Sequence, residues 1–110
     1  MNYIQIKEMI ESIGLPFTYY SFPIGEAPNL PYIIFYYPNN DDFSADNINY
    51  VPIVDLNIEL YTEEKNFELE EQVESVLKQN GFFYDKSETY IQQERMFQVL
   101  YTTNFLKKEN

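Results

Sequence analysis

The chain has 110 residues, the size of one ordinary domain, and carries 18 acidic against seven basic side chains, for a formal net charge of −11. It contains neither cysteine nor histidine, which excludes thiolate chemistry, cysteine-based zinc sites and histidine as a general base. Binding to nucleic acid is not expected either, because contact with phosphates depends on lysine and arginine.

The sequence also argues against a membrane partner. No stretch approaches the roughly 20 apolar residues that cross a bilayer. The N-terminal segment "MNYIQIKEMIES" is amphipathic and lacks the apolar centre of a signal peptide. We therefore expect the chain to remain in the cytoplasm where it is made.

Residues 2–13 are predicted to form a short amphipathic helix. Asn2 can cap its start, Gly14 fits just past its end, and Pro16 prevents continuation. The apolar residues that recur at helical spacing are Ile6, Met9, Ile10 and Ile13, with Tyr3 on the same face.

Three strands are expected next, over 17–22, 32–37 and 53–62. The segment between the first two holds three prolines and is predicted to be a stiff loop. Residues 32–37 are apolar on both faces, as suits a central strand. Residues 53–62 alternate, so one face is predicted to be buried and the other solvent-exposed. The predicted buried residues are Val54, Leu56, Ile58 and Leu60, and the predicted exposed ones are Asp55, Asn57, Glu59 and Tyr61.

A second helix over 66–80 and two more strands complete the chain. Asn66 is a good N-cap, and Gly81 follows as a C-terminal stop. The strands 82–91 and 96–106 are predicted to pair across a turn near 92–94. In the last strand Phe97, Val99, Tyr101 and Phe105 share one face, and Gln98, Thr102 and Asn104 the other. The acids of the helix's first turn, Glu68, Glu70 and Glu71, are predicted to be solvated and to complement the helix dipole.

This order of elements predicts a single α+β domain over residues 1–110. Most connections suit antiparallel pairing, and two amphipathic helices can cover one face of such a sheet. The result is a two-layer sandwich of order α-β-β-β-α-β-β. The exposed strand face, with Asn57, Glu59, Tyr61, Gln98 and Thr102, then has no covering layer within the chain.

The acidic segment 39–47, "NNDDFSADN", joins two apolar stretches and is the main candidate for a projecting loop. Asp41, Asp42, Ser44 and Asp46 offer oxygen ligands, but their spacing lacks the glycine and glutamate of a helix-loop-helix calcium site. We therefore predict no metal and instead consider an assembly arm. Its candidate contact residues are Asp41, Asp42, Phe43, Asp46 and Tyr50.

Nothing in the sequence indicates catalysis or a cofactor. The carboxylate pairs available are Glu63 with Glu64, Glu70 with Glu71, and Glu88 with Glu94. None is accompanied by a nucleophile elbow or a glycine-rich phosphate loop. We predict a protein that is not an enzyme and needs no cofactor.

The sequence as a whole resembles the tail-completion, or tail-terminator, proteins of long-tailed bacteriophages and prophages. The segments that carry this resemblance are "LPYIIFYYP", the acidic loop with "FSAD", "IELYTEEKNFELEEQVESVL" and "GFFYDKSETYIQQERMFQVLYT". The likeness is one of overall pattern over nearly the whole chain and includes no catalytic motif.

The resemblance implies a structural role in the virion. Proteins of this family form a ring, typically of six subunits, at the head-proximal end of the tail. The ring stops polymerisation of the tail-tube protein and offers a surface to the head–tail connector. On this chain the 39–49 loop would reach a neighbouring subunit or the tube, and the exposed sheet face would line the ring or pack against the next copy.

Three other interpretations remain open. A neck or minor capsid protein of similar size would share the fold. A small acidic inhibitor that mimics DNA would explain the charge, although its acids should then follow one extended face. The third is an interaction module with no connection to phage.

Overall fold

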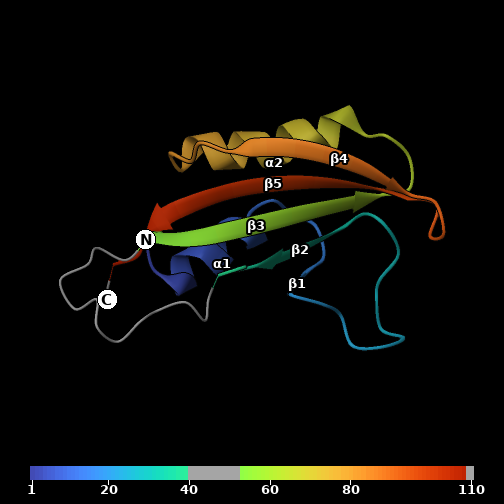
Figure 1. Cartoon of the computed structure of the whole chain (residues 1–110), viewed down its shortest axis with the longest axis horizontal. Helices are drawn as coiled ribbons and strands as arrows, with labels where there is room; N and C mark the ends of the chain where they lie inside the picture. Colours follow the sequence, from blue (N-terminus) through green and yellow to red (C-terminus); the bar gives the residue numbers. More distant parts are fainter. Residues whose placement is uncertain (40–52, 109–110) are drawn as a thin grey trace.

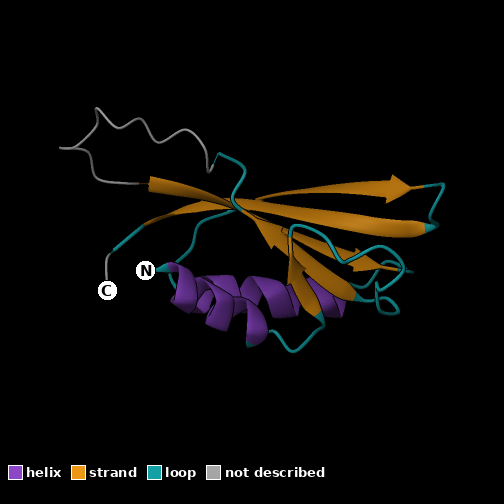
Figure 2. Ribbon diagram, turned by 90° about the horizontal axis from the view of Figure 1, so that it is seen from below, coloured by secondary structure: helices purple, strands orange, loops and turns teal. Residues whose placement is uncertain are grey.

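The computed structural model describes residues 1–39 and 53–108, which form a five-stranded sheet with two helices packed on one of its faces (Figures 1 and 2). This is the predicted two-layer α+β fold, in the predicted element order. The helices are α1 (Tyr3–Glu11) and α2 (Phe67–Gln79), and the strands are β1 (Phe17–Tyr19), β2 (Tyr32–Tyr36), β3 (Ile53–Thr62), β4 (Asp85–Ile91) and β5 (Met96–Leu106).

The strands lie in the order β1-β2-β3-β5-β4. β3 occupies the centre and pairs antiparallel with β5 along its whole length, from Ile53 opposite Leu106 to Thr62 opposite Phe97. β2 is an interior strand, as its apolar character predicted, and pairs antiparallel with β3. β1 and β2 are parallel to each other, a pairing that was not predicted from the sequence.

The core lies between the sheet and the two helices. The predicted alternation in β3 is confirmed, since Leu56, Ile58 and Leu60 are fully buried. Helical spacing brings one stripe from each helix onto this layer. The fully buried residues of the helices are Ile6 and Ile10 from α1 and Val73 and Leu77 from α2.

The helix ends follow from their capping residues. The Asn2 side chain accepts a hydrogen bond from the backbone N–H of Gln5, and the Gln5 side chain accepts one from the Asn2 N–H, which makes a capping box. Asn66 caps α2 by accepting from the N–H of Leu69 at 3.0 Å. Both predicted N-caps are thus confirmed.

Two predicted strands are shorter in the structure. The strand expected over 17–22 ends at Tyr19, because Tyr20 adopts a left-handed backbone with φ of 71° that an extended strand does not accommodate. The strand expected from residue 82 begins at Asp85. Before it, Phe82 packs into the core while Phe83 is 94% exposed.

Glu70 is buried, which corrects the prediction that the acids in the first turn of the second helix are solvated. Its side chain is held between two ammonium groups, with Lys65 Nζ 2.7 Å from Oε2 and Lys86 Nζ 2.9 Å from Oε1. The Lys86 contact is an ion pair without hydrogen-bond geometry at Oε1. Lys65 also pairs with Glu88, and Lys86 pairs with Glu74 at 2.7 Å.

This cluster couples the start of α2 to the edge strand β4. Burial acts to raise the pKa of Glu70, but Lys65 and Lys86 outweigh it and leave that pKa below its ordinary value. The Glu74 carboxylate, together with Glu70, raises the pKa of Lys86 against the effect of burial. Glu70, Lys65 and Lys86 therefore keep their charge at neutral pH.

Within residues 1–39 and 53–108, none of the helices combines the length and the apolar character that a membrane crossing requires.

Candidate functional site

The candidate site is the face of the sheet turned away from α1 and α2, here called the open face. Both helices lie on the opposite side, and no helix or strand of the described chain covers the open face (Figure 2). Its residues alternate with the core residues along each strand. The central ones are Tyr36, Asn57, Glu59, Tyr61, Gln98 and Thr102.

Strand register brings the predicted face residues together. Asn57 lies opposite Thr102 and Tyr61 opposite Gln98, with Glu59 between them on β3. On the other side of β3, Asn57 lies opposite Tyr36. The five residues predicted for an exposed sheet face therefore do share one face. Tyr36 also belongs to this face, although the sequence did not predict its contribution.

A hydrogen-bond network fixes these side chains. The hydroxyl of Tyr36 donates to Glu59 Oε2 at 2.9 Å, and that of Tyr61 donates to Glu59 Oε1 at 2.7 Å. Gln98 Nε2 donates to the Tyr61 hydroxyl at 2.8 Å, and Asn57 Nδ2 donates to the Tyr36 hydroxyl at 3.3 Å. The Glu59 carboxylate is thus oriented through both of its oxygens.

The two tyrosines remain hydrogen-bond donors over a wide pH range. Burial raises the pKa of Tyr61, and the hydrogen-bonded Glu59 carboxylate raises it further. Burial likewise raises the pKa of Tyr36, with Glu59 adding to the effect and the hydrogen bond from Asn57 opposing it. Both hydroxyls therefore stay protonated at neutral pH and hold the carboxylate.

Tyr61 is less accessible than the alternation in β3 predicted. It lies on the predicted face, yet it is only 8% exposed. Its ring centroid lies 5.3 Å from that of Tyr32, and its hydroxyl is engaged by Glu59 and Gln98. The other members of the network are partly exposed, so a partner would meet Glu59 and Tyr36 before Tyr61.

Aromatic side chains from the segment after β1 line one edge of the open face. Tyr20 packs edge-on against Tyr36, with 6.0 Å between ring centroids. Phe22 packs edge-on against Tyr32 at 5.1 Å. Tyr20 remains 69% exposed, so the edge of this face combines aromatic surface with the polar network.

One end of the open face forms a hollow of about 300 Å³ with two carboxylates in its lining. Asp55 and Asp85 lie there beside the amides of Asn39, Asn57 and Asn104. Asn39 Nδ2 donates to Asp55 Oδ2. Among residues 1–39 and 53–108, no group of three or more Asp and Glu side chains has the arrangement of a metal site.

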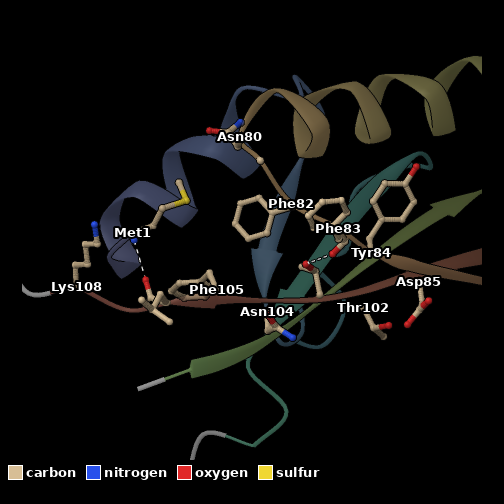
Figure 3. A pocket seen from close by; sticks show the side chains of 13 residues that line it. Met1, Asn80, Phe82, Phe83, Tyr84, Asp85, Thr102, Asn104, Phe105 and Lys108 are labelled. Carbon is tan, nitrogen blue, oxygen red and sulfur yellow. Dashed lines mark hydrogen bonds between the residues drawn. The ribbon is translucent and has the colours of Figure 1, made fainter. Parts of the chain in front are cut away.

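A larger hollow of about 660 Å³ lies beyond the start of β4, where β5 extends past its neighbour (Figure 3). Phe82 and Phe105 meet there with 6.4 Å between ring centroids, and Thr103 Oγ1 donates to the carbonyl of Phe83. Asp85 is the one carboxylate in the described lining. The hollow therefore does not offer the pair of carboxylates that acid–base chemistry uses.

The predicted assembly loop cannot be placed on this surface. Asp41, Asp42, Phe43, Asp46 and Tyr50 lie outside the described residues.

Comparison with protein-family models, curated proteins and solved structures gave no match to this chain.

Proposed function

We propose that this chain is a non-enzymatic structural subunit of a bacteriophage tail. It forms a ring at the head-proximal end of the tail, expected to be a hexamer, which stops tail-tube polymerisation and joins the tail to the head connector. Its partners are further copies of itself, the tail-tube protein and connector proteins. The protein is assembled in the bacterial cytoplasm and then resides in the virion.

The observation that carries this proposal is the open face. Antiparallel sheets commonly have one face that is solvated and polar. Here Tyr36, Glu59 and Tyr61 form an ordered network with Gln98. Ordered side chains lose less conformational entropy on association, and tyrosine is enriched at protein interfaces. The face is therefore suited to contact with another protein.

The resemblance of the sequence to tail-terminator proteins is what favours a ring over other kinds of assembly. A ring of identical copies is compatible with general symmetry rules, because a head-to-tail contact closes when the rotation between copies divides a full turn. The small size of the chain and the absence of histidine and cysteine agree with a structural role.

A DNA-mimicking inhibitor is the second candidate, favoured by the net charge of −11. Such a mimic would present its carboxylates along one face, at spacings related to the roughly 1.7 Å per charge of duplex DNA. The exposed carboxylates of the described chain occur on both layers, with Glu8 and Glu11 on α1, Glu68 and Glu71 on α2, and Asp85 on β4. This distribution favours the ring subunit over the mimic.

Solution mass measured by light scattering over a concentration series tests the proposal, first with the chain alone and then with purified tail tubes. We expect a closed oligomer whose population increases with protein concentration, or one that forms on the tail tubes. A variant with residues 40–46 replaced by a glycine–serine bridge should fold normally but associate less. A chain that stays monomeric at millimolar concentration and does not bind tail tubes would overturn the proposal.

A further inference from the structure

The charged strand residues of the open face are all acidic. Among its strand residues Asp55, Glu59 and Asp85 are acidic, whereas none is lysine or arginine. Lys86 is the only basic residue within the five strands, and it points to the other layer, where it pairs with Glu70 and Glu74. The open face therefore attracts cationic groups and has no basic strand residue of its own to neutralise it.

Glu59 at the centre of this face has the geometry of a receptor for a guanidinium group. Each of its oxygens accepts one tyrosine hydroxyl, and a carboxylate has about four acceptor positions, so capacity remains at both oxygens. The Tyr36 ring lies beside it and is partly exposed. Arginine binds carboxylates through two parallel hydrogen bonds and stacks on aromatic rings, which a lysine ammonium does less well.

The hollow at the end of the open face also offers carboxylate oxygens to a cationic group. Asp55 and Asp85 line it together with amide side chains, so a second cation of a bound partner would meet carboxylate oxygens there. Glu59 and this hollow lie on one continuous sheet surface, because β3 contributes both Asp55 and Glu59.

A second copy of this chain is poorly suited to supply those cations. The whole sequence has seven lysines and arginines against 18 acids. Two of the seven, Lys65 and Lys86, already form ion pairs within the subunit. Two such chains, each with a net charge of −11, would repel each other if their acidic open faces approached one another.

We propose that the open face docks a basic protein other than this chain, with a partner arginine bound by Glu59 beside Tyr36. The inference rests on the proposed function, in which this face is an assembly surface, and identifies its occupant as a basic tail or connector protein. The ring contacts between copies then lie on other surfaces. Nucleic acid is excluded as an occupant by the same charge that attracts the basic protein.

Titration of the full-length chain with a synthetic nona-arginine peptide tests the chemistry of the face. Nitrogen-15 amide spectra should show the largest shifts at Asn57, Glu59 and Gln98. Glu59→Gln keeps the shape of the side chain but removes its charge, and should weaken binding about tenfold or more. Glu71→Gln, which removes one exposed charge from the helical layer, should weaken it less than about twofold. Nona-lysine should bind more weakly than nona-arginine.

Asp85→Asn provides a second variant in case Glu59→Gln alters the fold, because Asp85 is exposed on the edge strand and also lines the hollow. It should weaken nona-arginine binding more than Glu71→Gln does. Equal losses for the open-face and helical-layer variants, or amide shifts centred on α1 and α2, would overturn the proposal. Either result would mean that the peptide responds only to net charge.

Light scattering on the same samples separates this inference from the proposed function. A chain that binds nona-arginine through Glu59 but stays monomeric, with tail tubes present as well as without them, supports the basic partner but counts against the ring. A closed oligomer whose affinity for nona-arginine is unchanged by Glu59→Gln supports the ring and overturns the basic partner.

Discussion

Replacement of Glu70 by glutamine is expected to destabilise the fold, because this carboxylate joins α2 to β4. Glu70 is 2% exposed and lies 2.7 and 2.9 Å from the ammonium groups of Lys65 and Lys86. Breaking a fully buried pair from one side costs about 3–5 kcal/mol. The lysine side chains, however, keep 27% and 37% of their surface exposed. Water therefore screens them, and we expect a loss of about 1–3 kcal/mol.

Urea unfolding followed by circular dichroism measures this loss at neutral pH, with Glu71→Gln as the matched control. Glu71 is the next residue on the same helix but is exposed, so its replacement should change the free energy of unfolding by less than about 0.5 kcal/mol. If the two variants have the same stability, the ion-pair cluster does not contribute as described.

The pH dependence provides an independent check. The pKa of Glu70 in the folded chain lies below its ordinary value of 4.5. The stability that it contributes is therefore fully present above pH 4.5 and is lost as the pH falls through the lower folded value. The difference between the wild-type chain and Glu70→Gln should shrink as the solution is acidified below 4.5. A difference that stays constant on acidification would refute the assignment to charge.

Two further predictions concern other parts of the fold. Asn66→Ala removes the acceptor for the Leu69 N–H and should lower the free energy of unfolding by about 1 kcal/mol; an unchanged urea midpoint would contradict this capping role. Tyr101→Phe removes the buried hydroxyl that donates to Glu74 Oε2 at 2.8 Å and should cost about 1–2 kcal/mol. Tyr90→Phe, at a ring that is 49% exposed, is its control, and equal effects of the two would count against the Tyr101 bond.

The periodicity of the sequence predicted most of the fold because burial in this chain follows simple spacing. The alternation in β3 and the N-caps Asn2 and Asn66 are local signals, and each gave the correct element. The left-handed conformation of Tyr20 has no comparable signal, since glycine or asparagine usually marks such positions. The parallel pairing of β1 with β2 depends on tertiary packing and could not be read from either segment alone.

The burial of Glu70 did have a signal in the sequence. Glu70 precedes Val73 and Leu77 by three and seven residues, so it lies on the apolar stripe of α2. Its lysine partners, Lys65 and Lys86, lie before and after α2 in the sequence. Only the folded structure brings both to Glu70, and their charges keep the buried carboxylate ionised.

The open face was predicted in its position but not in its organisation. Alternation placed Glu59 and Tyr61 on one side of β3, yet it could not show that Tyr61 is shielded by its neighbours. The contribution of Tyr36 depends on the register between β2 and β3, which long-range pairing determines. The bonds from two tyrosines to one carboxylate therefore appear only in the folded structure.

The strand order determines when the open face can be completed during synthesis of the chain. β5 leaves the ribosome after the other four strands of the sheet, yet it inserts between β3 and β4 rather than at an edge. Until it does so, β3 lacks one of its two neighbours, and Gln98 and Thr102 are missing from the open face. A chain that has not yet inserted β5 therefore lacks part of the proposed docking surface, so the topology itself would keep such incomplete chains from docking.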